Sequence, residues 1–142
     1  MNLDRRLSLS LLLLRLGVFV VMLAWTLDKF ANPDHAAAVA ENFYMLEGLG
    51  PTVLGVIGAV QLVIVLAFAV GFCRKISYGL VLLMHAVSTF SSYQQYLDPW
   101  NNLLFFAAWP MLAACAALFL LREEDTLLSV DALRGRKQSN ED

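Results

Sequence analysis

Residues 7–27, LSLSLLLLRLGVFVVMLAWTL, decide the fold that this sequence predicts. An α-helix needs about 20 apolar residues to cross a bilayer core about 30 Å thick. Three further apolar runs of similar length follow, at residues 53–72, 76–93 and 103–121. None of them alternates apolar and polar residues in the way that strands of a membrane barrel do. The sequence therefore predicts an all-α integral membrane protein, built as a four-transmembrane-helix bundle.

The composition is typical of a membrane protein and limits the kinds of partner that we expect. Of the 142 residues, 59% are hydrophobic and 15% are charged, whereas soluble domains average about 45–50% apolar and about 25% charged residues. The formal net charge of -2 is too balanced for a nucleic-acid-binding protein. The two cysteines, Cys73 and Cys115, form no C-x-x-C motif and no metal-ligand spacing. Membrane lipids are therefore expected partners, and nucleic acid is not.

Basic residues are divided unevenly between the two sides of a four-span chain. Only Lys29 falls on one side. Eight fall on the other: Arg5, Arg6, Arg74, Lys75, Arg122, Arg134, Arg136 and Lys137. The positive-inside rule then predicts cytoplasmic N- and C-termini, which in a bacterium means a multi-pass protein of the inner membrane. Residues 1–122 form the predicted membrane domain, and residues 123–142 form a charged cytoplasmic tail that is partly disordered.

The segment between the first two spans is too long for a bare turn. Asn32 can cap a helix and Pro33 suits the first helical position, so a short extracytoplasmic interfacial helix is expected at residues 33–46. This outer helix would form a lid with Lys29, His35 and Glu47, either packed over the bundle or acting as a gate or docking surface. One histidine among solvated carboxylates argues against a metal site here.

Four polar residues inside the spans are the candidate site: Arg15, Gln61, His85 and Ser88. Counted from the cytoplasmic side at 1.5 Å per residue, Arg15, His85 and Gln61 lie about 12, 14 and 17 Å deep. They could therefore meet in one layer. Two interpretations are open. The layer is either a cavity for a polar headgroup, a quinone or a proton, or a structural contact in which Arg15 bonds to Gln61 and nearby carbonyl groups.

Short motifs resemble the DoxX-like family of small four-helix bacterial membrane proteins. They are Leu14-Arg15-Leu16-Gly17, Asp28-Lys29-Phe30, the stretch from Leu54-Gly55 to Gln61, and Gly71-x-x-Arg74. The resemblance covers roughly residues 7–122. The R-x-G motif and the terminal lysine of the family fall on Arg15, Gly17 and Lys29. The position that is often acidic in the family is Gln61 here.

The resemblance implies an accessory subunit that associates with a redox or assembly complex in the inner membrane, and so a second membrane or membrane-associated protein as a partner. Two alternatives stay open: a binder or carrier of a quinone or lipid-like molecule in an intrabundle cavity, and a small quinone- or thiol-linked oxidoreductase. The sequence carries no flavin, haem or nucleotide motif, which argues against autonomous catalysis. No catalytic residue, metal or cofactor is therefore predicted, beyond a quinone or lipid as a bound ligand.

Overall fold

The computed structural model describes residues 2–138, and within this range the chain forms helices and no strand. The elements are α1 (Leu3–Ala31), α2 (Pro33–Tyr44), α3 (Pro51–Ala69), α4 (Arg74–Ser91), α5 (Tyr93–Leu97), η1 (Pro99–Asn101), η2 (Leu103–Ala107), α6 (Ala108–Leu120) and α7 (Val130–Gln138). Three stretches are long and apolar enough to cross a membrane: Leu3–Ala31, Pro51–Ala69 and Leu103–Leu120. They support the prediction of a multi-pass membrane protein.

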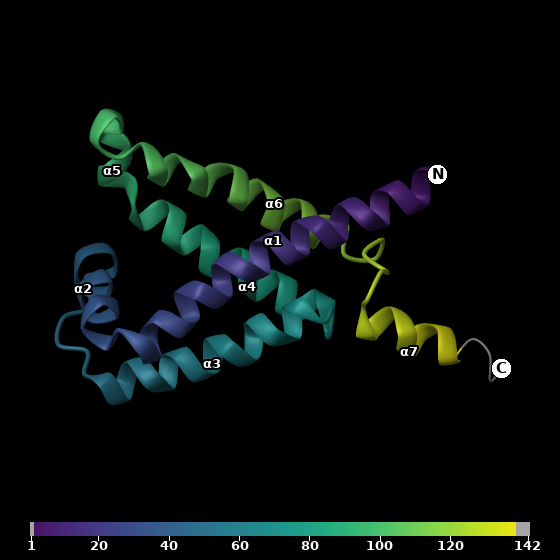
Figure 1. The fold of residues 1–142 in the computed structure, drawn as a ribbon, viewed down its shortest axis with the longest axis horizontal. Coiled ribbons are helices and arrows are strands. Elements are labelled where there is room, and N and C mark those ends of the chain that lie inside the picture. Colours follow the sequence, from purple (N-terminus) through teal and green to yellow (C-terminus); the bar gives the residue numbers. More distant parts are fainter. Residues whose placement is uncertain (1, 139–142) are drawn as a thin grey trace.

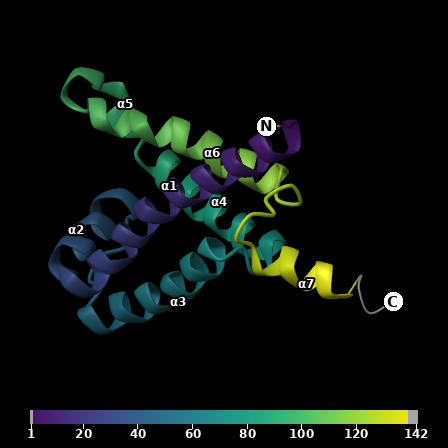
Figure 2. The ribbon, with the colours of Figure 1, turned by 45° about the vertical axis from the view of Figure 1, so that its right-hand side comes forward.

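The long helices form two crossing pairs (Figure 1). Helix α1 packs mainly against α3, and α4 packs mainly against α6, while contacts of α3 with α4 and of α1 with α6 join the pairs. Helices α2 and α5 lie at one end of the molecule, and the N-terminus and α7 lie at the other (Figure 2). We call these the α2 end and the α7 end.

Local sequence signals explain several helix boundaries. The side chain of Asn2 caps α1 by accepting a hydrogen bond from the backbone N–H of Arg5. Pro33 opens α2, and Met45 ends it in a left-handed conformation with φ 58°, so α2 is two residues shorter than the predicted range 33–46. Pro51 opens α3 after a turn that contains Gly48 at φ 71°.

The hydrophobic core lies between the two helix pairs. Its buried residues come from all four long helices: Leu11, Val18, Met22, Val65, Phe68, Tyr78, Val81, Cys115 and Leu118. Large apolar side chains also cover the outside, as Val20 on α1, Val63 on α3 and Leu83 on α4 show. A protein with a core and an apolar exterior suits lipid as its solvent.

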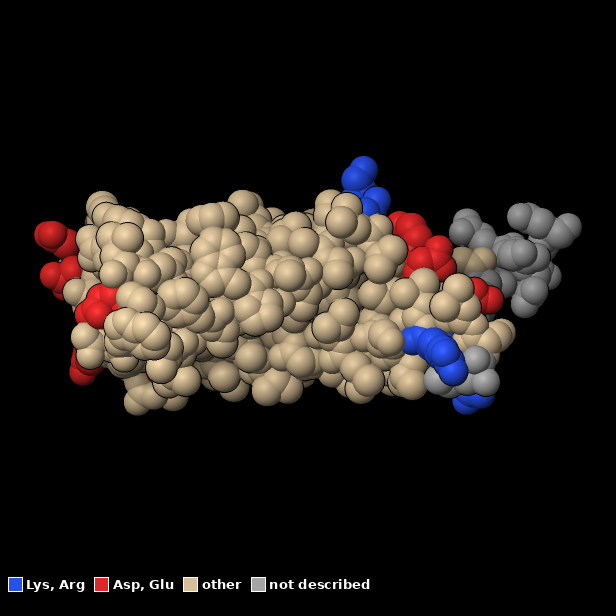
Figure 3. Space-filling view, turned by 90° about the horizontal axis from the view of Figure 1, so that it is seen from above, with Lys and Arg blue, Asp and Glu red and all other residues tan. Residues whose placement is uncertain are grey.

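Exposed charged residues gather at the two ends of the molecule on the face that Figure 3 shows. Figure 3 shows Asp and Glu at the α2 end, Lys and Arg together with acidic residues at the α7 end, and a broad band without charged residues between them. The surface therefore separates charge in the way expected of a membrane-spanning bundle.

The region after α6 differs from the predicted tail. Residues 139–142 of that tail lie outside the described residues. Within the described part, the chain after α6 folds back onto the α7 end, where Asp125 and Ser129 are fully buried, and it continues into α7. Buried polar contacts thus order residues 123–131, the first part of the segment that the sequence predicts to be a charged, partly disordered tail.

Candidate functional site

Arg15 lies in the middle of α1 and is fully buried. Its Nη1 donates to the hydroxyl oxygen of Tyr78 at 3.2 Å, and its Nη2 donates to the carbonyl oxygen of Leu127. Its Nε lies 3.6 Å from Oδ2 of Asp125, whose carboxylate is also fully buried. Tyr78 donates to the same Oδ2 at 2.7 Å. Arg15, Tyr78 and Asp125 therefore form a buried cluster in which the two charges compensate each other.

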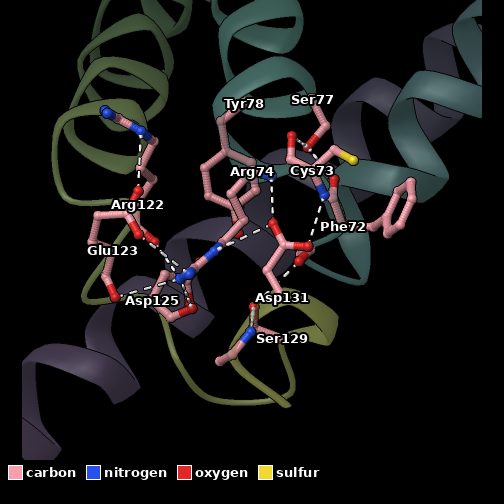
Figure 4. Close-up of polar contacts among 12 residues, drawn as sticks. Phe72, Cys73, Arg74, Ser77, Tyr78, Arg122, Glu123, Asp125, Ser129 and Asp131 are labelled. Carbon is pink, nitrogen blue, oxygen red and sulfur yellow. Dashed lines mark hydrogen bonds and ion pairs between the residues drawn. The ribbon is translucent and has the colours of Figure 1, made fainter. Parts of the chain in front are cut away.

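Asp125 reaches Arg15 because the chain turns back across the α7 end after α6. We call residues 122–131 the C-terminal clasp. The guanidinium of Arg74, at the start of α4, donates to the carbonyl oxygens of Arg122 and Asp125 (Figure 4). It also lies 3.5 Å from the carboxylate of Glu123. Arg74 thus holds the first part of the clasp in the position that buries Asp125.

The second part of the clasp closes the turn between α3 and α4. The carboxylate of Asp131 accepts hydrogen bonds from the backbone N–H groups of Cys73 at 3.0 Å and Arg74 at 2.8 Å (Figure 4). The carbonyl oxygen of Gly71 accepts from the hydroxyl of Ser129 at 3.2 Å and from the backbone N–H of Asp131. Groups at a helix end lack partners within their own helix, so these contacts supply partners for the start of α4 and for the turn that follows α3.

Gly71 leaves the space in which Arg15 and the clasp meet. Its φ is +62°, in the left-handed region that favours glycine, and it is buried. A Cβ at this position would lie 2.5 Å from Nη1 of Arg15 and 2.7 Å from Oγ of Ser129. The Gly71-x-x-Arg74 stretch therefore positions the clasp in two ways. Gly71 leaves space for it, and the guanidinium of Arg74 bonds to it.

The structure does not bring Arg15 and Gln61 into contact, which was one of the two interpretations that the sequence left open. Arg15 bonds to Tyr78 and to the clasp at the α7 end, whereas Gln61 lines a cavity beneath α2. His85 bonds to Ala108, so no hydrogen bond joins Arg15, Gln61 and His85 within the described residues. Depth along a helix could not identify the partner of Arg15, because that partner comes from beyond the last span.

His85 is buried on α4 and uses one of its two ring nitrogens. Its Nε2 donates to the carbonyl oxygen of Ala108 at 3.0 Å, and Thr89 Oγ1 lies 3.3 Å from the same nitrogen. Its Nδ1 is buried without a hydrogen-bond partner among the described residues. The ring of Trp25 stacks on the imidazole, with a distance of 5.9 Å between ring centroids. An unpaired buried nitrogen is unusual in a folded protein.

A cavity of about 910 Å³ lies between α1, α4 and the η2–α6 stretch. Its wall is largely apolar, and His85, Ser88 and Ser92 supply polar groups on one side. The hydroxyl of Ser88 makes no hydrogen bond within the described part of the chain. Leu13 and Leu104 line the cavity and are exposed on the outside of the molecule. This large cavity therefore opens onto the apolar surface and combines a long apolar wall with a small polar patch.

A second cavity, of about 530 Å³, lies beneath α2, and we call it the α2 cavity. Lys29, His35 and Gln61 all line it. Four residues line both cavities and mark the boundary between them: Trp25, Ser88, Ser92 and Phe105. Of the predicted site residues, Ser88 and His85 thus meet at the large cavity, and Ser88 and Gln61 at the α2 cavity.

Helix α2 covers the α2 cavity. Ala36 and Ala40 are the buried residues of α2, and His35 pairs with Asp28 on α1 at 2.7 Å. Glu47 is exposed in the turn after α2 and does not line the α2 cavity. Of the residues predicted for the lid, Lys29 and His35 therefore lie at a cavity, and Glu47 lies away from it.

Asp125, Tyr78 and Trp25 were not among the predicted site residues. For Asp125 a signal was present, because residues 126–130, TLLSV, interrupt the charged tail with a largely uncharged stretch that suggests burial. A buried arginine in a membrane helix also needs a compensating group. Trp25 and Tyr78 carry no comparable signal in the sequence.

Comparison with protein-family models, with curated proteins and with solved structures found no match for this chain.

Proposed function

We propose that this chain binds a lipid-like or quinone-like molecule in the large cavity. The observation that supports this function best is the composition of the cavity wall. An apolar cavity with a few polar groups is the usual form of a small-molecule site, and about 910 Å³ lies within the usual range of about 300–1,000 Å³. Leu13 and Leu104 line this cavity and are exposed on the apolar outside, so such a molecule could enter from the lipid on that side.

We propose a membrane topology of four spans, in which α4 crosses the membrane in addition to the three long apolar stretches. Buried Ser77, His85 and Thr89 of α4 face other helices, while Leu83 and Phe90 are exposed. This amphipathic pattern suits a span whose polar face is covered by its neighbours. Helix α2 would then lie at the outer interface, and the basic residues of the α7 end would make that end cytoplasmic, in the inner membrane of a bacterium.

Reporter fusions test this topology. A reporter fused after Asp142, or inserted beside Lys75, is expected to behave as cytoplasmic, and one inserted near His35 as periplasmic. A C-terminal reporter on the periplasmic side would contradict four spans with cytoplasmic termini.

Substitution of Gly17 tests the binding function. Gly17 lines the large cavity, and a Cβ at this position would meet no atom within 4 Å. Gly17→Leu should therefore place its side chain in the cavity and narrow it, because the Cβ itself meets no neighbour. Gly55 on α3 has the same free space but does not line the large cavity, so Gly55→Leu is the matched control.

Native mass spectrometry of the protein purified in mild detergent measures the result. The wild type and Gly55→Leu are expected to retain a lipophilic molecule, and Gly17→Leu to lose it. If Gly17→Leu retains the molecule as fully as the wild type does, the large cavity is not its site.

The accessory-subunit role implied by the DoxX-like resemblance stays a prediction beside this proposal. Affinity purification from membranes, followed by identification of the co-purified proteins, tests it. If the chain is an accessory subunit, the same membrane protein or oxidoreductase should co-purify with the wild type and with Gly17→Leu. The substitution lies in the cavity and should not change a contact surface on the outside.

A further inference from the structure

Lys29 is the cation of the α2 cavity. It is the only Lys or Arg between residues 16 and 73, and it lines this cavity near the end of α1. Its Nζ donates to the carbonyl oxygen of Trp25 at 3.2 Å. No carboxylate of the described residues lies within 4.0 Å of this ammonium. An ammonium has three N–H donors, so two remain for a ligand.

The other polar groups of the α2 cavity favour an anion near Lys29. Asp28 is the only carboxylate in the wall, and it already accepts hydrogen bonds from His35 at 2.7 Å and Asn32 at 3.2 Å. Gln61 lines the cavity from α3, and its side chain makes no hydrogen bond to any described residue. Its amide N–H₂ can therefore donate to the same anionic group as Lys29.

Gly58 holds Lys29 close to α3. A Cβ on Gly58 would lie 2.9 Å from the ring of Phe30 and 3.3 Å from Cβ of Lys29. The close approach that this glycine permits brings the Lys29 end of α1 against α3, on the helix that also carries Gln61. The ammonium and the amide thus belong to one tightly packed corner of the cavity.

The boundary shared by the two cavities provides a route for an alkyl chain. Because Trp25, Ser88, Ser92 and Phe105 line both cavities, a molecule with its head in the α2 cavity could extend its chain past them. The apolar wall of the large cavity would then receive the chain. One amphiphilic molecule would occupy both spaces.

The charge on the outside indicates how such a ligand arrives. Asp34, Glu41, Glu47 and Asp98 are exposed at the α2 end, where Figure 3 shows acidic residues. A negative surface repels anions that approach from water, whereas an anion on an alkyl chain can enter from the lipid through the large cavity.

We propose that the α2 cavity binds the anionic head, carboxylate or phosphate, of a single-chain amphiphile, with Lys29 as its counter-ion and the chain in the large cavity. This inference rests on the proposed binding function, to which it adds the chemical class of the ligand.

Quenching of Trp25 fluorescence by a brominated chain tests the proposal. Trp25 lines both cavities, whereas Trp109 lines neither. A variant with Trp100→Phe and Trp109→Phe reports on Trp25, and a variant with Trp25→Phe and Trp100→Phe reports on the outer surface through Trp109. Dibromostearic acid and its methyl ester are the probes, titrated into the purified full-length protein in detergent.

The acid is expected to quench Trp25 in a saturable manner, and to bind about tenfold more tightly than the ester. Lys29→Gln should remove this tenfold preference, and Lys29→Arg, which keeps the charge, should retain it. Displacement of the acid by unlabelled oleate, compared with displacement by oleoyl lysophosphatidate, distinguishes a carboxylate head from a phosphate head.

Two results would overturn the proposal, and they can be told apart. If the acid and the ester quench Trp25 with equal affinity, and Lys29→Gln changes neither affinity, the cavity binds a chain but does not select an anion. Only this inference then fails. If both probes quench Trp25 no more than they quench Trp109, neither cavity holds a chain, and the proposed binding function fails as well.

Discussion

Arg15 and His85 are both buried polar side chains in long helices, but their surroundings differ. Arg15 bonds to Tyr78 and Leu127 and pairs with Asp125, so its charge is compensated within the protein. His85 bonds through one nitrogen and forms part of the wall of an open cavity. The α7 end is therefore organised to hold the helices together, while the middle of the molecule and the α2 end keep space for a ligand.

Removing one member of the buried ion pair should produce the largest effect. Arg15→Leu or Asp125→Leu leaves a single buried charge, which typically costs about 3–5 kcal/mol of unfolding free energy. The double variant should be more stable than either single variant, because no uncompensated charge remains. Titration from mild detergent into SDS, followed by helix content, measures these free energies. If the single variants are as stable as the wild type, the ion pair does not contribute to the free energy of unfolding.

Gly71→Ala should produce an intermediate effect at the same end. Alanine in a left-handed conformation costs about 1–2 kcal/mol, and here its Cβ would also displace Arg15 and Ser129. Gly48 is the matched control, because its φ is +71° but a Cβ there meets no atom within 4 Å. We expect Gly71→Ala to lower the free energy of unfolding by about 1–3 kcal/mol more than Gly48→Ala does in the same titration. Equal losses of stability in the two variants would mean that the clasp can move away from residue 71 without destabilising the protein.

His85→Phe should have the smallest effect on stability. The change removes the hydrogen bond to Ala108, which is worth about 0.5–1.5 kcal/mol, and keeps an aromatic ring beside Trp25. Native mass spectrometry should at the same time show less of the retained lipophilic molecule. A loss as large as that of Arg15→Leu would place His85 among the residues that hold the bundle together, and would weaken the contrast between the two regions.

Hydrophobic runs predicted most of the fold, because a helix that faces lipid must be apolar along its whole length. Residues 7–27, 53–72, 76–93 and 103–121 all fall largely within helices of the structure. A short helix after the first long one was also predicted, since Pro33 marks its start. These features depend on local sequence, so a single sequence is enough to recognise them.

The clasp could not be predicted in the same way. The position of Asp125 depends on Arg74, Gly71 and Arg15, which come from different parts of the chain and meet only after the helices have packed. The large cavity likewise depends on how α1, α4 and α6 diverge. Sequence reasoning identified Arg15 and His85 as unusual residues, but only their surroundings separate a structural residue from a candidate ligand site.

A high-resolution structure of the wild-type protein in lipid nanodiscs tests the central claim most directly. We predict an elongated density between α1, α4 and α6, with its polar end near Ser88 or in the α2 cavity, and an intact cluster of Arg15, Tyr78 and Asp125. Helices that close on one another and leave no space beside His85 would contradict the claim that this region holds a ligand.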